Sequence, residues 1–132
     1  GTVRAFVVHG ADGLDEISTT GYTKVSELRG GCVRTFYVHP ADFGLAKAAA
    51  GGLAGGDAAV NAAIVTRVLG GEAGPARDVV LLNAGAALMV AGEAGSVREG
   101  IARAAEAIDA GHASRTLERL VAASRAGQEG GA

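Results

Sequence analysis

The 132-residue sequence has few of the residues on which several common classes of protein depend. Aromatic residues make up 4% of it and tryptophan is absent, so it lacks the stacking surfaces that single-stranded nucleic acids use. The 12 lysines and arginines do not outnumber the 14 aspartates and glutamates, and they form no basic cluster. With a net charge of −2, we expect no nucleic-acid partner.

Cysteine and long apolar runs are also scarce. The single cysteine, Cys32, cannot form an internal disulfide, and we interpret it as the filler of a half-buried strand in a reducing compartment. The most apolar stretch, residues 79–92, is interrupted by Asn83 and is shorter than the roughly 18 to 20 residues of a membrane span. No signal peptide is visible. We expect a cytoplasmic protein with no membrane partner.

The first 40 residues carry strand patterns. The β-branched and aromatic run 3–8 predicts a strand that is covered on both faces. Residues 23–28 and 32–38 predict a hairpin around a Gly-Gly turn, and Pro40 ends its second strand. Because the chain opens at Gly1 and enters the first strand almost at once, we expect a segment of a longer protein.

After Gly44 the composition shifts to alanine and leucine, and the pattern predicts helices. The second of them is apolar on nearly every side, so we expect it to lie buried between other elements. The sequence thus predicts an α/β protein, a few strands followed by a run of helices, in one domain over residues 1–127 with a flexible tail at 128–132. The expected helices run from the cap at Asp57 to Leu69, from about Ala76 after Pro75 to Ala91, from the Ser96-Glu99 capping box to Gly111, and from about Ser114 to Ser124 with Leu117, Leu120 and Val121 facing inward.

One loop concentrates acidic residues directly after the first strand: "HGADGLDEIS" carries Asp12, Asp15 and Glu16 among glycines. Adjacent side chains diverge in a helix or a strand, so Asp15 and Glu16 can share a ligand only in an irregular loop, which the glycines permit. Neighbouring carboxylates repel each other unless a cation lies between them, and oxygen ligands of this kind suit Mg²⁺. The spacing alone leaves two interpretations open, a magnesium site and a solvated acidic turn.

Other motifs have both a functional and a structural interpretation. The glycine-rich stretch 51–57 resembles a phosphate cradle, but it lacks the lysine of a P-loop, and Asp57 as a helix cap explains it. His9 abuts the acidic loop and either orients it or hydrogen-bonds at the end of a strand. Asn83, alone on an apolar helix, is expected to satisfy a buried backbone group or a neighbouring helix. The remaining candidates are Ser18, Thr19 and Thr20, as hydroxyl ligands or a polar turn, and His39 and His112, as loop residues.

Six segments of the chain, in order, resemble the anthranilate phosphoribosyltransferases of tryptophan biosynthesis. They are "HGADGLDEIS", "TKVSEL", "YVHPADFGL", "GGDAAVNAAI", "GPARDVVLLNAGAAL" and "AAEAIDAGHA", which together span about Val3 to Leu120. The most specific piece is "DGLDE". The resemblance implies the C-terminal part of a nucleoside-phosphorylase-like phosphoribosyltransferase α/β domain. It also implies that Asp15 and Glu16 bind magnesium, with the glutamate touching both of two ions.

The resemblance further implies a reaction, in which the amine of anthranilate displaces pyrophosphate from phosphoribosyl pyrophosphate while Mg²⁺ neutralises charge on the leaving group. In the family, the pyrophosphate loop and the residues that hold anthranilate lie upstream of the segments matched here. We therefore assign no catalytic residue, leave the substrate-binding residues unknown, and expect this chain to be inactive by itself. The homodimer of the family is formed mainly by the upstream helical domain, so the oligomeric state of this chain stays open.

Two alternatives remain. The first is a nucleoside phosphorylase-like relative with another acceptor. The segment "GPARDVVLLNAGAAL" argues against it, because it resembles the anthranilate phosphoribosyltransferases. The second is a non-catalytic fragment or module that binds magnesium or phosphate. The opening at Gly1 and the small sheet favour a fragment over an independent module.

Overall fold

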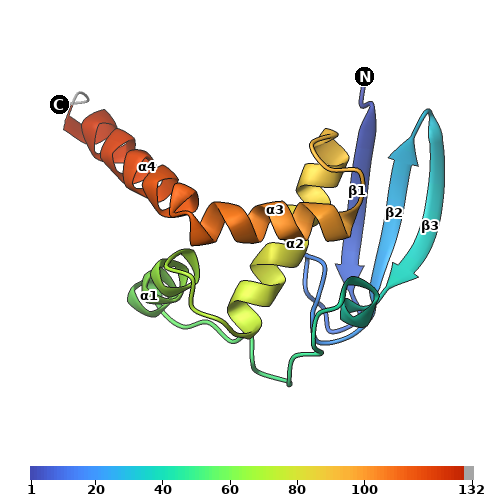
Figure 1. The fold of residues 1–132 in the computed structure, drawn as a ribbon, viewed down its shortest axis with the longest axis horizontal. Helices are drawn as coiled ribbons and strands as arrows, with labels where there is room; N and C mark the ends of the chain where they lie inside the picture. Colours follow the sequence, from blue (N-terminus) through green and yellow to red (C-terminus); the bar gives the residue numbers. More distant parts are fainter. Residues whose placement is uncertain (130–132) are drawn as a thin grey trace.

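The structure, a computed structural model, describes residues 1–129 and contains a three-stranded sheet and four α-helices (Figure 1). The elements, in chain order, are β1 (Arg4–Gly10), β2 (Thr23–Arg29), β3 (Cys32–Val38), a short 3₁₀ helix (Pro40–Phe43), α1 (Ala58–Leu69), α2 (Pro75–Ala91), α3 (Val97–Asp109) and α4 (His112–Glu129). The predicted order of strands followed by helices is confirmed, and the fold class is α/β. Of the predicted tail, residues 128 and 129 belong to α4, and 130–132 lie outside the described residues.

The sheet is antiparallel in the order β1-β2-β3, and β2 and β3 form the predicted hairpin. Gly30 and Gly31 make the turn with φ angles of +58° and +77°, a left-handed geometry that glycine adopts without steric cost. β3 ends at Val38, directly before His39-Pro40, as the proline predicts. The local signals of the sequence therefore place the hairpin and its end correctly.

Only one face of the sheet is packed in the part of the chain that the structure describes. Phe6 and Val8 of β1 pack with the buried Ile17, whereas Val7 between them is 70% exposed. The prediction that this strand is covered on both faces is therefore wrong here, because antiparallel pairing with β2 leaves alternate side chains pointing away from the helices. Cys32, predicted to be half-buried, is exposed, since it pairs with Arg29 beside the tight turn.

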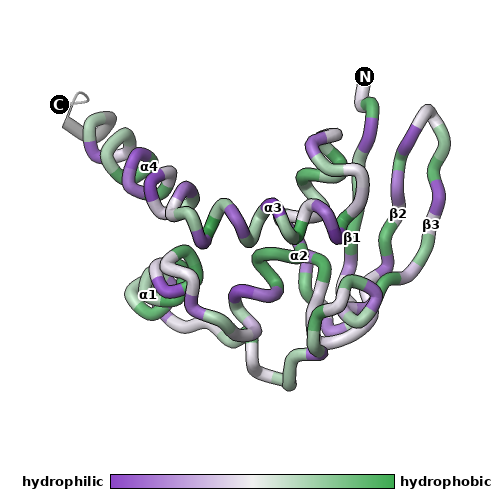
Figure 2. Tube along the Cα trace, in the orientation of Figure 1, coloured by the Kyte–Doolittle hydropathy of each residue, from purple (hydrophilic) through white to green (hydrophobic). Residues whose placement is uncertain are grey.

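Helix α2 is the centre of the core (Figure 1). Leu82 is fully buried and packs with Ile17 on the side of the sheet, while Leu81 contacts Ala104 and Ile108 in the group that α1 and α3 complete. Figure 2 shows that the hydrophobic residues concentrate along α1 and α2. The predicted burial of α2 holds for most of its faces but not for Val80, which is 40% exposed.

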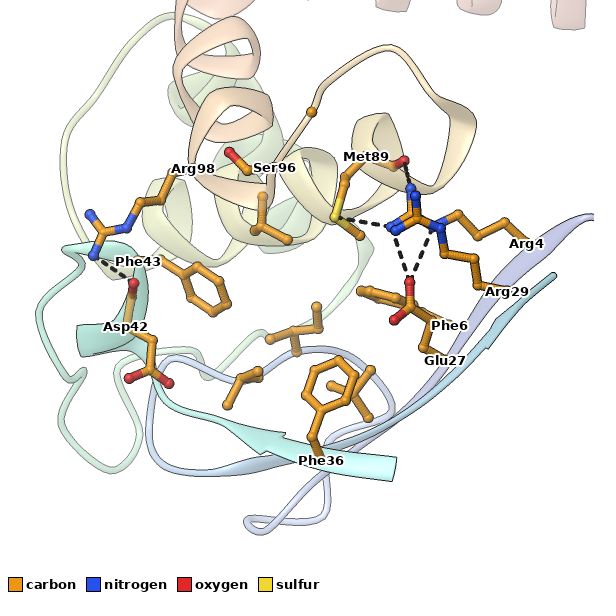
Figure 3. Close-up of a pocket in the computed structure, with 15 residues that line it drawn as sticks. Arg4, Phe6, Glu27, Arg29, Phe36, Asp42, Phe43, Met89, Ser96 and Arg98 are labelled. Carbon is orange, nitrogen blue, oxygen red and sulfur yellow. Dashed lines mark hydrogen bonds and ion pairs between the residues drawn. The ribbon is translucent and has the colours of Figure 1, made fainter. Parts of the chain in front are cut away.

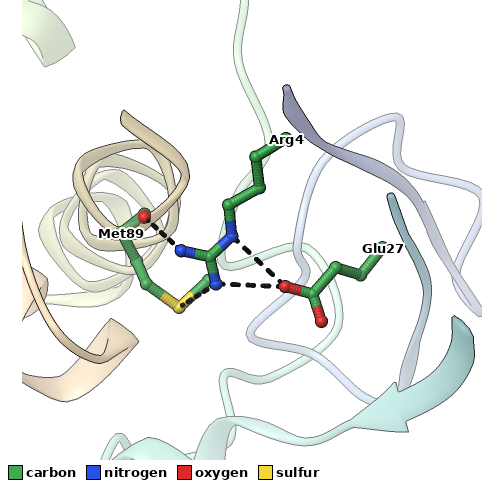
Figure 4. Close-up of polar contacts among 3 residues, drawn as sticks. All are labelled: Arg4, Glu27 and Met89. Atoms are coloured by element: carbon green, nitrogen blue, oxygen red, sulfur yellow. Dashed lines mark hydrogen bonds and ion pairs between the residues drawn. The ribbon is translucent and has the colours of Figure 1, made fainter. Parts of the chain in front are cut away.

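A charged side chain joins the sheet to the end of α2 (Figure 4). The guanidinium of Arg4 on β1 donates to Glu27 Oε1 on β2 at 3.0 and 3.2 Å and to the carbonyl oxygen of Met89 at 2.8 Å. Met89 lies in the last turn of α2, where carbonyl groups lack partners within the helix and a cation is favourable. Arg4 therefore ties two strands and one helix together at a partly buried position.

The helix caps agree with the sequence, with one difference. The side chain of Asp57 accepts a hydrogen bond from the Val60 amide, so the predicted cap of α1 is confirmed. Ser96 accepts from the Glu99 amide at the start of α3, but the Glu99 carboxylate accepts from the amide of Gly95 at 2.8 Å. In the expected capping box the Glu99 carboxylate would accept from the Ser96 amide, and in the structure it accepts from the amide of the preceding residue, Gly95.

Helix α4 departs most from the prediction. It runs from His112 to Glu129 and extends away from the other elements (Figure 1). Leu120 is 64% exposed and Val121 is 37% exposed, so the expectation that they face inward is wrong for the described chain. The first turn of α4 is anchored by the Ser114 hydroxyl, which donates to the Leu69 carbonyl of α1. The apolar pattern of the helix predicts a face that needs cover, but it does not say what provides it.

None of the helices formed by residues 1–129 combines the length and the apolar character that crossing a membrane requires.

Helices α2 and α3 cross at two glycines whose backbones touch. A Cβ atom added at Gly85 would lie 2.6 Å from the Ile101 amide nitrogen and 2.9 Å from the Val97 carbonyl oxygen. A Cβ atom at Gly100 would lie 2.8 Å from the Cα of Gly85. Contacts this short are far inside van der Waals separation, so no side chain fits at either position without moving one helix.

We predict that Gly85→Ala and Gly100→Ala each lower the free energy of unfolding by about 3 kcal/mol, because the added methyl group forces the two helices apart. The loss should appear although alanine has a better helix propensity than glycine, by about 1 kcal/mol. Chemical denaturation measures the effect. Gly21→Ala is the matched control, since a Cβ there meets open space. Equal stabilities of Gly85→Ala and Gly21→Ala would contradict the close crossing.

Candidate functional site

The acidic loop, residues 11–22, connects β1 to β2 and is folded by its own backbone. The Gly10 amide donates to the Leu14 carbonyl and the Gly13 amide to the Gly10 carbonyl, both at 2.9 Å. Gly13 has a φ of +91°, and a Cβ at Gly10 would press on the Asp12 carboxylate and come within 3.3 Å of Ser18. The two glycines therefore serve the purpose that the sequence predicts, an irregular turn directly after a strand.

Asp12 organises the start of this loop. Its carboxylate accepts hydrogen bonds from the hydroxyls of Ser18 and Thr20 and from the Leu14 amide. The bonds from Ser18 and then Thr20 hold the pKa of the Asp12 carboxyl below its ordinary value. The hydroxyls proposed as additional ligands are thus engaged within the loop, and the polar-turn interpretation accounts for Ser18 and Thr20. Thr19 is fully buried.

Asp15 and Glu16 occupy the tip of the loop with different exposure. Asp15 is exposed and Glu16 is half-buried. Desolvation raises the pKa of Glu16, and repulsion from the charges of Asp15 and Asp12 raises it further. Within residues 1–129, no lysine or arginine forms an ion pair with either carboxylate. The negative charge at the tip is therefore not compensated by this part of the protein.

The carboxylates of Asp15 and Glu16 fit a hard divalent cation that takes most of its ligands from water and substrate. In the part of the chain that the structure describes, no three His, Cys, Asp or Glu side chains are arranged to hold a metal ion. The loop supplies two adjacent carboxylates, and Mg²⁺ typically takes one or two carboxylates together with waters and substrate phosphates. The uncompensated charge beside Glu16 is what such a cation would neutralise. Asp15 and Glu16 are thus the residues that would hold it.

The glycine-rich stretch lies beside the acidic loop. The Ala48 amide donates to the Thr19 carbonyl at 2.9 Å, and a cavity of about 460 Å³ is lined by Glu16, the turn at 52–55 and side chains of α1 and α2. The Gly56 amide, however, donates to the Asn61 side chain. Because this amide and that of Val60 are already used to cap α1, the geometry favours the cap over the phosphate cradle.

A second cavity, of about 430 Å³, lies between the sheet and helices α2 and α3 (Figure 3). Its walls include Phe6 and Phe36, whose rings meet edge to face with centroids 6.2 Å apart. Two of the charged groups that line it are engaged with their neighbours: Arg4 binds Glu27, and Arg98 donates to the Asp42 carbonyl at 2.6 Å. This cavity is an apolar gap in the packing, and it presents no pair of reactive groups.

In the part of the chain that the structure describes, no histidine side chain hydrogen-bonds to the acidic carboxylates of the loop. His9 pairs with Lys24 in the sheet, and within the described chain its side chain makes no hydrogen bond to the loop. His39 caps the 3₁₀ helix by accepting from the Ala41 amide, and its ring lies 4.9 Å from that of Tyr22. His9 thus lies near the end of a strand, as one interpretation predicts, but the hydrogen bond expected of its side chain is not found among the described residues.

Asn83 contacts the acidic loop from α2. The sequence predicts that its side chain satisfies a buried polar group, but not which group. Its side chain binds the backbone of Ile17, the residue after Glu16. A lone asparagine on an apolar helix signals a buried polar contact, but the target of that contact is 66 residues away in the sequence. No local pattern in the sequence points to it.

The chain matches the family described as "Glycosyl transferase family, a/b domain" over residues 1–114. It is 54% identical over 123 residues to the anthranilate phosphoribosyltransferase of Parvibaculum lavamentivorans, covering 93% of this chain and 36% of that protein. It is 52% identical over 126 residues to that of Methylobacterium nodulans, covering 96% of this chain and 37% of the relative. The chain thus spans about a third of the length of these relatives.

Solved structures agree in fold. The anthranilate phosphoribosyltransferase of Thermus thermophilus superimposes with a TM-score of 0.81 at 41% identity, covering 90% of this chain and 35% of that one. The enzyme of Saccharomyces cerevisiae in complex with PRPP and Mg superimposes with a TM-score of 0.77 at 33% identity, covering 86% and 33%.

We predict that Glu16→Gln raises the melting temperature at pH 7 without divalent cations. The pKa of Glu16 is higher in the folded state than in the unfolded state. Protonated Glu16 therefore stabilises the fold at pH values below the unfolded-state pKa near 4.5, and this stabilisation is lost as the pH rises through the folded-state pKa. The glutamine removes a half-buried charge that neighbouring carboxylates repel at pH 7, and its advantage should vanish near pH 4. Thermal unfolding at the two pH values measures this, with the exposed Glu106→Gln on α3 as the control for net charge. Identical melting curves for Glu16→Gln and the wild type at pH 7 would contradict it.

Proposed function

We propose a function from one premise: the chain belongs to the glycosyl transferase family, a/b domain. It is the C-terminal segment of the α/β domain, over residues 1–127, of an anthranilate phosphoribosyltransferase. The complete enzyme transfers the phosphoribosyl group of phosphoribosyl pyrophosphate to anthranilate in tryptophan biosynthesis, in the cytoplasm. The identity of 54% to a curated enzyme of that name supports this assignment, although the chain spans about a third of it.

The observation that carries the proposal is the uncompensated pair of carboxylates at Asp15 and Glu16. In the proposed reaction the bond between ribose C1 and the diphosphate oxygen breaks, a bond forms between C1 and the amine nitrogen, and the nitrogen releases one proton to solvent. Negative charge accumulates on the departing diphosphate. Bound Mg²⁺ supplies the positive charge that stabilises this leaving group. One of the similar yeast structures is described as having Mg bound, which supports the choice of cation.

The residues of this chain act by position rather than by proton transfer. Asp15 and Glu16 present their carboxylate oxygens from one irregular loop, so both can face the same ion. Asp12, held by hydroxyl hydrogen bonds, fixes the start of the loop. The half-buried setting of Glu16 strengthens its attraction for a cation, because water screens the interaction less. We assign no general acid or base to this segment.

In the complete protein, we predict that Asp15→Asn combined with Glu16→Gln lowers kcat by about 100-fold, because the charge that stabilises the leaving group is no longer held in place. The activity that remains should require a higher magnesium concentration. Steady-state kinetics across a magnesium titration measure both effects. The matched control is Glu106→Gln with Glu118→Gln, which removes two exposed carboxylates on α3 and α4. Unaltered magnesium dependence in the first double variant would remove the basis of the site.

We predict that the 132-residue chain alone does not consume anthranilate in the presence of phosphoribosyl pyrophosphate and Mg²⁺. Holding two reactants in line contributes roughly 7 to 11 kcal/mol to catalysis, and no residue of this chain is assigned to either organic substrate. The fall of anthranilate fluorescence is the assay. Steady consumption by the chain, after mass spectrometry has excluded a longer contaminant, would show that the active site lies within these residues.

A further inference from the structure

The backbone of the acidic loop is held by one side chain from the middle of α2. Asn83 Oδ1 accepts a hydrogen bond from the Ile17 amide at 2.9 Å, and Asn83 Nδ2 donates to the Ile17 carbonyl oxygen, also at 2.9 Å. Nδ2 donates in addition to the Val79 carbonyl, one turn earlier in α2, at 3.0 Å. Both amide hydrogens and the amide oxygen of Asn83 are therefore used.

We infer that Asn83 is a positioning residue for the carboxylates of Asp15 and Glu16. Its amide pairs with both backbone groups of Ile17 as a neighbouring strand would, and the bond to Val79 orients the amide against the helix. Ile17 follows Glu16 directly, so fixing its backbone restricts the direction in which the Glu16 side chain leaves the loop. The part of this inference that concerns the metal rests on the proposed function.

The loop needs such a restraint because two of its features oppose a fixed tip. Gly10 and Gly13 give its start backbone freedom, and the charges of Asp15 and Glu16 repel each other. Without a cation, that repulsion favours any movement that separates the two carboxylates. The side chain of Ile17 is buried in the core, which holds the loop in place. Burial of an aliphatic side chain does not fix the rotation of its backbone, whereas two hydrogen bonds to the same residue do.

The effect of Asn83 on the loop can be distinguished from an effect on the stability of α2. Asparagine is a poorer helix former than alanine, so α2 itself gains from its removal. The groups that lose their partners are the amide and carbonyl of Ile17, outside the helix. Removing Asn83 should therefore loosen the loop more than the strands that follow it.

The test uses the complete protein and the variant Asn83→Ala. Hydrogen–deuterium exchange at peptides that contain Ile17 should accelerate about tenfold or more, because its amide loses its acceptor. Exchange in β2 should change far less. Titration with Mn²⁺ alone, followed by the electron paramagnetic resonance of the free ion, should show an affinity about 10- to 100-fold weaker, the usual consequence of removing a group that orients a ligand. Asn83→Leu keeps a side chain of similar size but removes the acceptor and both donors without adding a charge, and it should change both readouts in the same direction if Asn83→Ala does not fold.

The matched control is Ser114→Ala. It removes a comparable hydrogen bond from a side chain to a backbone carbonyl, at Leu69, on α4 rather than at the loop. Its exchange at Ile17 and its Mn²⁺ affinity should equal those of the wild type. Unchanged exchange at Ile17 in folded Asn83→Ala would overturn the inference, and so would faster exchange with unchanged Mn²⁺ affinity. Intact Mn²⁺ binding in the Asp15→Asn, Glu16→Gln variant would instead reject the proposed metal site, and exchange at Ile17 would still decide whether Asn83 holds the loop.

Discussion

The contact between the backbones of Gly85 and Gly100 fixes the two central helices, and the other elements are arranged around them. At the crossing point itself there is no room for a side chain between α2 and α3, and the faces of α2 on either side of that point contact different partners. Leu82 faces Ile17 and the sheet, and Leu81 faces α1 and α3. The same helix holds the strands through the Met89 carbonyl and the acidic loop through Asn83. Its nearly uniform apolar sequence follows from this central position.

Two of the three carboxylates of the acidic loop have opposite surroundings. Asp12 is surrounded by hydroxyl and amide donors, which favour its ionised form and hold it within the loop. Glu16 is partly desolvated and lies close to two like charges, which disfavour its ionised form. A single short segment thus contains one carboxylate whose charge stabilises the fold and another whose charge is tolerated at the expense of stability. Groups that a protein keeps at such an expense are candidates for function, since structure alone would favour a glutamine there.

What the sequence predicts well is local. The Gly-Gly hairpin, the end of β3 at Pro40 and the cap at Asp57 depend on residues within a few positions of each other, and all are confirmed. The errors concern burial, which depends on partners far along the chain: Val7, Cys32 and Leu120 are exposed where cover was expected. For the candidate site, the sequence identifies the acidic residues and the irregular loop. It does not reveal that Ile17 is the target of Asn83, because that contact exists only once α2 lies against the loop.

The incomplete ligand set at Asp15 and Glu16 agrees with the size of the chain relative to its relatives. Two carboxylates cannot satisfy the roughly octahedral shell of Mg²⁺, so the remaining ligands must come from water, from a substrate or from residues outside this segment. A protein that bound the ion fully by itself would hold it whether or not substrate was present. If Asp15 and Glu16 hold the ion as proposed, with their direction fixed by Asn83, two carboxylates would bind it weakly until a diphosphate completed the shell. Under this proposal the cation would be held firmly only when there was a leaving group for it to stabilise. The rigidity of the loop, rather than the number of its ligands, would then determine how well the cation and the leaving group are aligned.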